Sequence, residues 1–180
     1  MSNRLQSFIL NGLIFVNVSG YVSWVVYAIA FIALLFKKPD WVGPWVFSLV
    51  QHLNVIGIPF IALFVVLSFI PATRGLGGLL GIVVSRIYSL GGTLTALLIV
   101  YSCWGVFGII VGTGLLGFGI LPVGIISSIL LHDKIFLTTL LQFTAFILIG
   151  QFAGRSLITK WAAAEDRKAA ALLDTPASPV

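Results

Sequence analysis

Long runs of apolar residues, separated by short polar clusters, cover most of this chain. The runs are continuous and do not alternate between apolar and polar positions, a pattern typical of membrane-spanning α-helices and not of a transmembrane β-barrel. A hydrocarbon core of about 30 Å needs about 20 apolar residues per helix, so 180 residues have room for a handful of spans. The pattern predicts an all-α, polytopic transmembrane helical bundle with about five spans and with interfacial helices.

The breaks between the apolar runs place the predicted spans. We expect them near residues 18–36, 46–70, 89–111, 115–131 and 135–152. The polar cluster at residues 37–40 ends the first span, because ammonium groups resist dehydration and proline ends helices. Pro59 lies inside the second run, where its missing N–H should kink the helix.

The bundle at residues 17–154 is flanked by two segments of different character. In residues 1–16, polar side chains recur at helical spacing on one side, which suits a helix lying at the membrane interface. We expect residues 155–180 to form a helical tail that continues into water. Within the bundle, the glycine-rich stretch 71–81 predicts a loop followed by an interfacial helix, because this keeps Arg86 out of a span, where it costs about 2.5–3.5 kcal/mol.

The Lys and Arg residues near the span ends predict the orientation. With five spans, one side holds six of the ten, which leaves four on the other: Arg4, Arg74, Arg86 and Lys134. If residues 115–131 re-enter the membrane without crossing it, the bundle has four spans and both termini lie on the same side. That side then holds seven of the ten basic residues, and the opposite side holds the other three: Lys37, Lys38 and Lys134. Since positive residues concentrate in the cytoplasm, both arrangements predict a cytoplasmic C-terminus, and we expect a multi-pass protein of the cell inner membrane.

The composition indicates lipid as the solvent. Hydrophobic residues make up 59% of the chain and charged residues 8%, too few polar groups to cover a compact body in water. The net charge of +5 would suggest nucleic acid as the partner of a soluble chain, but here the basic residues lie mostly at span ends. We therefore expect a lipid bilayer, and no nucleic acid, as partner.

Few side chains inside the predicted spans could carry chemistry. His52 and Asn54 on the second span and Gln142 on the fifth form a candidate intramembrane polar site, which could line a path or hydrogen-bond to a neighbouring helix. The single cysteine, Cys103, excludes an internal disulfide and a multi-cysteine metal site. We expect no catalytic residue, no metal and no cofactor.

Basic residues and glycines provide two further groups of candidates. Arg86, Arg155 and Lys160 are candidates for contact with lipid or with a partner, since a guanidinium readily binds phosphate and long basic side chains also anchor helices at the interface. Two pairs of glycines lie one turn apart on one helix face, which lets helix backbones approach closely. The pairs are Gly108 with Gly112 and Gly150 with Gly154.

Two functions remain open at this stage. The chain could be a non-enzymatic accessory or assembly subunit of a larger membrane complex, packed against a membrane-protein partner or another copy of itself. Recovery of a lone monomer from a mild-detergent purification at native expression would count against that hypothesis. The alternative is a small channel or carrier for a small molecule or ion. The lack of Asp or Glu in the predicted spans disfavours ion-coupled transport, which typically uses buried carboxylates.

Overall fold

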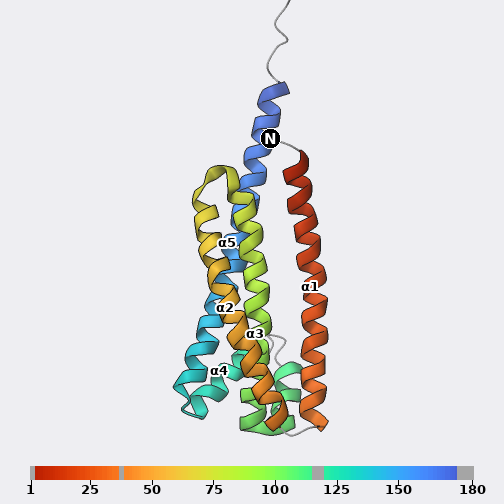
Figure 1. Cartoon of the computed structure of the whole chain (residues 1–180), viewed down its shortest axis with the longest axis vertical. Coiled ribbons are helices and arrows are strands. Elements are labelled where there is room, and N and C mark those ends of the chain that lie inside the picture. Colours follow the sequence, from red (N-terminus) through yellow and green to blue (C-terminus); the bar gives the residue numbers. More distant parts are fainter. Residues whose placement is uncertain (1–2, 37–38, 115–119, 174–180) are drawn as a thin grey trace, which may run out of the picture.

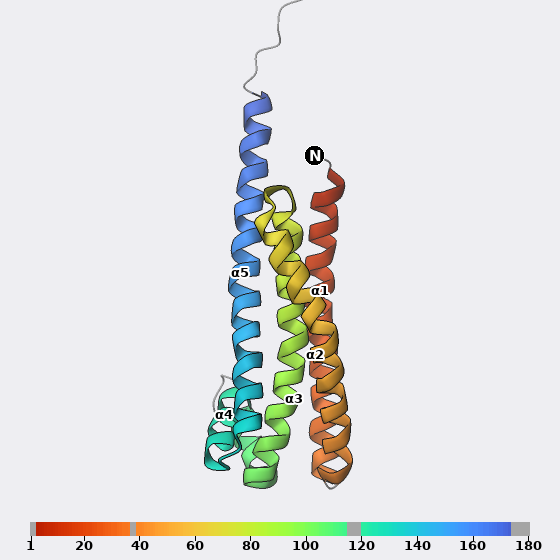
Figure 2. The same cartoon turned by 60° about the vertical axis from the view of Figure 1, so that its left-hand side comes forward.

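The chain folds as an elongated bundle of helices. The computed structural model describes residues 3–36, 39–114 and 120–173, and within these ranges every regular element is helical. The elements are α1 (Asn3–Phe36), α2 (Pro39–Phe69), the short 3₁₀ helix η1 (Pro71–Thr73), α3 (Arg74–Gly114), α4 (Ile120–Leu130) and α5 (Lys134–Leu173). The long helices stand side by side in both views (Figures 1 and 2). The predicted all-α bundle is confirmed.

Four of the described helices are long and apolar enough to cross a membrane, so this is a multi-pass membrane protein. The fifth, α4, has 11 residues and a length of about 17 Å, short of a hydrocarbon core of about 30 Å. The span predicted at 115–131 is thus reduced to a short helix, and its residues 115–119 lie outside the described residues. The beginning of α1 and the end of α5 lie at the same end of the bundle, called the terminal end below (Figure 1). This arrangement matches the four-span alternative.

Two helix boundaries differ from the predicted ones. The segment expected to lie at the interface, residues 1–16, is from Asn3 onward part of the continuous helix α1. The predicted loop at 71–81 is reduced to η1, after which α3 runs unbroken through Arg86. Glycine is a turn signal in isolation, but here tertiary packing of the glycines against neighbouring helices overrides that local preference.

The seam between α3 and α5 shows why those glycines are helical. A Cβ atom added at Gly150 would lie 2.5 Å from the carbonyl oxygen of Gly81, and one at Gly154 would lie 2.7 Å from that of Gly78. The two backbones are therefore in direct contact, as small residues permit between membrane helices. The Ser85 hydroxyl donates a hydrogen bond across the same seam to the carbonyl of Ile147 at 3.1 Å.

A sharp kink near the other end of α3 turns the chain back toward α1. Gly105 has φ 60° and ψ −153°, a conformation open in practice only to glycine. Beyond it, Thr113 donates to the carbonyl of Ile109 at 2.7 Å, so the Tyr27 hydroxyl of α1 must be the donor in its 2.8 Å bond to Thr113. The Trp104 indole donates to the Ser127 hydroxyl of α4 at 3.1 Å. The Tyr27–Thr113 bond fastens the returning segment to α1, and the Trp104–Ser127 bond fastens the residue just before the kink to α4.

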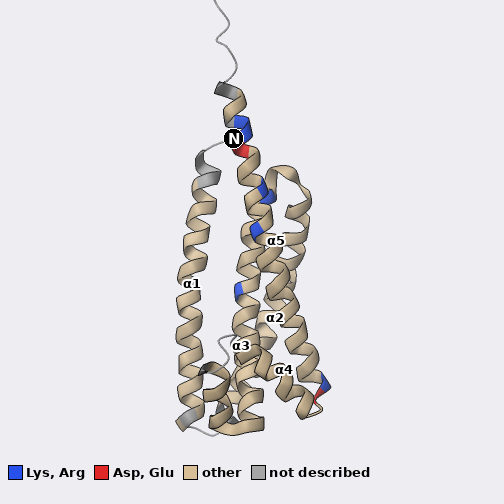
Figure 3. Ribbon diagram, turned by 180° about the vertical axis from the view of Figure 1, so that it is seen from behind, with Lys and Arg blue, Asp and Glu red and all other residues tan. Residues whose placement is uncertain are grey.

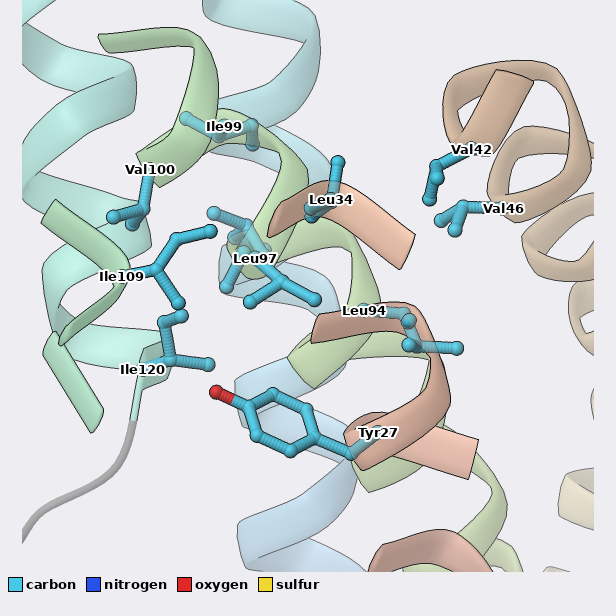
Figure 4. Close-up of a cluster of buried hydrophobic side chains, with 13 residues drawn as sticks. Tyr27, Leu34, Val42, Val46, Leu94, Leu97, Ile99, Val100, Ile109 and Ile120 are labelled. Carbon is cyan, nitrogen blue, oxygen red and sulfur yellow. The ribbon is translucent and has the colours of Figure 1, made fainter. Parts of the chain in front are cut away.

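The largest buried cluster lies where α1, α2, α3 and α4 meet, away from the terminal end, and Leu140 of α5 also belongs to it. It is made of Tyr27, Leu34, Val42, Val46, Leu94, Leu97, Val100, Ile109 and Ile120, with other small and aliphatic residues. Figure 4 shows these side chains pointing toward one another from the surrounding helices, with the Tyr27 hydroxyl directed toward Ile120. By contrast, most large apolar side chains on the outside of α1 and α2 are exposed, as expected for surfaces that face lipid.

The four-span arrangement makes a topology prediction. In a Cys103→Ser background, the single substitutions Ala72→Cys and Ala163→Cys should react with a membrane-impermeant maleimide from the same side of the membrane, and His132→Cys from the other. All three positions are exposed; Ala72 lies in η1, His132 lies between α4 and α5, and Ala163 lies on α5 beyond Arg155. Labelling in sealed right-side-out and inside-out vesicles measures this. Labelling of positions 72 and 163 from opposite sides would instead require a fifth crossing.

Candidate functional site

Two cavities lie along α3, and Arg86 lines both of them. The terminal-side cavity, of about 320 Å³, lies between α1, α3 and α5; its other polar lining residues are Asn17, Gln151, Arg155 and Thr159. The loop-side cavity, of about 350 Å³, extends away from the terminal end; its other polar lining residues are Ser23, Tyr27, Ser89, Thr93 and Thr113. Arg86 therefore separates two spaces that extend in opposite directions along the bundle.

The depth of Arg86 in the membrane follows from the α3–α5 seam. Since Ser85 bonds to Ile147, Arg86 lies at about the level of Ile147 on α5. At 1.5 Å per residue, Ile147 is roughly 20 Å along α5 from Lys134 and roughly 12 Å from Arg155. These two basic residues are together about 32 Å apart, close to the thickness of a hydrocarbon core of about 30 Å. With Lys134 and Arg155 placed at the two membrane surfaces, Arg86 lies within a few ångströms of the middle of the membrane.

The Arg86 side chain has an unsatisfied donor at this depth. Its Nε atom is buried, and no group in the described part of the chain accepts a hydrogen bond from it. Asp133 accepts from the backbone of Ile135 and Phe136 at the start of α5, and Glu165 pairs with Lys168. Asp166, beside Glu165 near the end of α5, is exposed. Arg86 as a whole is partly exposed, toward the cavities that it lines. A charge at this depth in a membrane is still costly, so the arrangement favours an anion that comes from outside the described chain.

Charged residues elsewhere lie mostly toward the ends of the bundle. Figure 3 shows Lys, Arg, Asp and Glu on the upper part of α5 and at the α4–α5 connection, with long uncharged stretches between. This is the distribution expected of a membrane helix bundle, because charges at the ends of spans stay near water. Arg86 departs from it, which is why its surroundings are the candidate site.

The predicted polar site is not assembled in the structure. His52 and Gln142 are exposed on the outer faces of α2 and α5, and the His52 Nδ1 lies 2.6 Å from the carbonyl oxygen of Ser48, one turn earlier. Asn54 is partly buried, and its Oδ1 has no hydrogen-bond partner among the described residues. None of the three lines either of the two cavities.

The other predicted candidates are distributed unevenly. Arg155 is exposed and lines the terminal-side cavity together with Arg86, whereas Lys160, also exposed, lines neither cavity. Gly150 and Gly154 lie against the backbone of α3, as described above. A Cβ at Gly112 would meet its nearest neighbours at ordinary distances of 3.6 Å, and one at Gly108 would clash with Trp104, one turn earlier in the same element.

Several polar lining residues were not predicted as candidates. On α5, Gln151, Arg155 and Thr159 recur every fourth residue, and on α3, Arg86, Ser89 and Thr93 share one face. Such spacing puts polar groups in a stripe along an otherwise apolar helix. This signal was present in the sequence, but the polar groups of each stripe are mostly weak ones that membrane helices also use to hydrogen-bond their own backbone. Thr93, for example, donates to the carbonyl of Ser89 at 2.7 Å.

Searches for metal sites and for relatives add no further candidate. Among the described residues, no group of three or more His, Cys, Asp or Glu lies close enough to hold a metal ion. No family model, no curated protein and no solved structure matches this chain. The function must therefore be argued from the geometry around Arg86.

Proposed function

We propose that the protein is a carrier for a small anionic molecule, with Arg86 as the group that binds the anion. The observation that carries this proposal is the position of Arg86, near the middle of the membrane, with a buried Nε that lacks a partner within the described chain. An ionisable residue inside a membrane bundle is costly and is usually retained for a ligand or a transport path. A permanently charged guanidinium specifies a negative ligand.

The two cavities support carriage and not only binding. Because Arg86 lines both, a ligand held there has space on the terminal side and on the loop side. The loop-side cavity continues along α3 past Ser89 and Thr93 and reaches the Tyr27–Thr113 hydrogen bond. Hydroxyl groups can solvate an anion in steps after it leaves the guanidinium, as donors that line a transport path do.

The same proposal covers the cellular setting. We infer that the chain is not an enzyme, since the residues around Arg86 offer a group that binds an anion but no pair of a nucleophile and its base. With four spans, the seven-to-three division of basic residues favours a cytoplasmic terminal end, in the cell inner membrane. Labelling of Ala163→Cys from the cytoplasmic side of inverted vesicles tests this orientation.

The accessory-subunit hypothesis keeps one supporting observation. Gln51 and His52 are exposed on the outer face of α2. At 1.5 Å per residue they lie roughly 18 Å or more along the helix from Pro39, well inside the span. The His52 Nδ1 bonds to the carbonyl of Ser48 on its own helix. Lipid offers no hydrogen-bond partner to the other polar atoms of these two side chains, so a helix of another protein could cover them. Purification in mild detergent, as described above, remains the test of this second candidate.

Removal of the Arg86 charge should abolish carriage. In proteoliposomes, we expect the wild-type protein to speed the transbilayer movement of labelled inorganic phosphate or of a fluorescent phosphatidic acid relative to protein-free vesicles. Arg86→Gln should return both rates to the protein-free level. Arg86→Lys should retain part of the rate, because it keeps the charge and loses the two-pronged geometry of the guanidinium. Uptake of the radiolabel and quenching of the fluorophore by dithionite measure the two probes.

His52→Ala is the matched control for this experiment. His52 is a polar residue of the same bundle that lines neither cavity, so its loss should leave both rates unchanged. A wild-type protein that moves neither probe, or an Arg86→Gln variant as fast as wild type, would refute the proposed function.

A further inference from the structure

The terminal-side cavity combines two guanidinium groups with an apolar wall. We infer that it binds the phosphate group of an anionic amphiphile that enters from the bilayer between α1 and α5. This inference rests on the proposed function and names the class of its ligand. Arg86 and Arg155, from different helices, line the same space. The carboxylates of Asp133 and Glu165 bond elsewhere, to the start of α5 and to Lys168.

Two guanidinium groups favour a phosphate over a carboxylate. A carboxylate has two oxygens and one charge, which a single guanidinium can satisfy in a bidentate pair. A phosphate group presents more acceptor oxygens, and as a monoester carries up to two charges, so it can engage both arginines at once. The amides of Asn17 and Gln151 and the hydroxyl of Thr159 line the same cavity and are further donors for its remaining oxygens.

The cavity is closed toward the terminal end by apolar side chains. A Cβ atom at Gly75 would lie 2.7 Å from Cδ1 of Ile9 and 2.8 Å from Cδ2 of Trp161, so these two side chains, from α1 and α5, meet α3 at this glycine. Ile9 is 2% and Trp161 9% exposed. Gly75 lies roughly 10 Å from Ile82, which lines the cavity, in the direction of the terminal end. Entry along the bundle axis is therefore blocked by packed apolar groups.

The side of the cavity offers a different route. Below Ile9 and Trp161, α1 and α5 each pack on α3 and make little contact with each other. The cavity between them has α3 as its floor, and its apolar lining residues are Leu13, Val16, Ile82 and Ile158. A ligand that enters here comes from the hydrocarbon, so it needs an apolar part. Arg155 lies at the level expected for the membrane surface, and the backbone of Arg86 lies roughly 12 Å deeper along the bundle. The charged part of the ligand therefore meets Arg155 first and, once bound, lies between the two guanidinium groups that line the cavity.

Binding in detergent tests the ligand class directly. The full-length protein, washed free of lipid in dodecyl maltoside, is titrated with dioleoyl phosphatidic acid, inorganic phosphate and oleate, and its thermal unfolding is followed by tryptophan fluorescence. Binding to the native state raises the unfolding temperature. We expect phosphatidic acid to stabilise the protein at concentrations roughly tenfold or more below those needed for oleate, and Arg155→Gln to weaken its binding by a similar factor.

Lys160→Gln is the matched control, since Lys160 is an exposed basic residue of the same helix that lines neither cavity. It should leave the affinity for phosphatidic acid within about twofold of wild type, which separates the cavity from general attraction of basic residues to acidic lipid. The Arg155→Lys variant should bind with intermediate affinity, because it keeps the charge only.

The results distinguish a phosphate group on a lipid from free phosphate, and they distinguish failure of this inference from failure of the carrier proposal. Inorganic phosphate binding as tightly as phosphatidic acid would overturn the amphiphile, and oleate binding as tightly would overturn the preference for phosphate. Equal affinities in wild type and Arg155→Gln would remove the site from this cavity. If phosphatidic acid does not bind while Arg86-dependent movement of labelled phosphate persists in vesicles, this inference falls and the carrier remains.

Discussion

Arg86→Met is expected to make the ligand-free protein more stable. In the wild type, the guanidinium lies near the middle of the membrane, and its buried Nε has no acceptor among the described residues. A charged residue at the centre of a span costs about 2.5–3.5 kcal/mol on insertion scales, and apolar replacement of buried ionic groups often stabilises by about 1–4 kcal/mol. Methionine keeps much of the length and flexibility of the side chain without the charge. We expect a gain of about 1–3 kcal/mol in the free energy of unfolding.

The same substitution should remove the response to anions. Unfolding of the lipid-free protein by sodium dodecyl sulfate in mixed micelles gives the stability difference, and repetition with phosphatidic acid shows whether the ligand still stabilises. Arg155→Met is the control, because Arg155 is exposed, and its replacement should change the ligand-free stability by no more than about 0.5 kcal/mol. A less stable Arg86→Met protein would mean that the guanidinium holds the bundle together, and a structural role would replace the binding role.

The ends of the first helices could be predicted closely, because strong local chemistry determines them. The polar cluster at 37–40 predicted the end of a span at residue 36, and α1 ends at Phe36. Residues 37–38 themselves lie outside the described residues. Two lysines and a proline stop a membrane helix in almost any tertiary context, so the sequence alone is enough there.

The start of α3 could not be predicted by the same local reasoning. Glycine at 75, 77, 78 and 81 is a turn signal in isolation. In the structure, however, side chains or backbone of other helices pack against these four glycines, in the same order Trp161, Leu67, Ile158 and Phe64. A loop at 71–81 puts Arg86 at the membrane surface, where its charge does not carry the cost of a position inside a span. The depth of Arg86, and with it the candidate site, depends on long-range packing that no local pattern contains.

The glycine pairs show the same limit at single positions. The sequence assigns equal packing roles to Gly112 and Gly150, since both belong to pairs with the same spacing. Of these two glycines, only Gly150 lies so close to another helix that an added Cβ would meet its backbone. The spacing identifies a face that could approach a neighbour, but which neighbour arrives is decided by the whole bundle.

Gly150→Ala should therefore destabilise the protein, whereas Gly112→Ala and Gly20→Ala should not. The added methyl group at 150 would lie 2.5 Å from the carbonyl oxygen of Gly81, and a backbone atom cannot move aside as a flexible side chain can. Such overpacking typically costs about 1–3 kcal/mol, which exceeds the gain in helix propensity of up to about 1 kcal/mol. Nothing lies within 4 Å of a Cβ at Gly20, so there the propensity gain is left unopposed. Unfolding in mixed micelles measures all three variants.

This substitution should also reach the site, because the α3–α5 seam sets the distance between the two arginines that line the terminal-side cavity. If the methyl group pushes α5 away from α3, Arg155 moves away from Arg86, and affinity for phosphatidic acid should fall even in the fraction of Gly150→Ala protein that remains folded. Gly20, on α1, lines the loop-side cavity and not the terminal-side cavity, and nothing lies within 4 Å of a Cβ added there. Gly20→Ala should therefore keep wild-type affinity for phosphatidic acid. Unchanged stability of Gly150→Ala would show that the backbones are farther apart than described. Lowered stability with unchanged affinity would show that the seam and the cavity are independent.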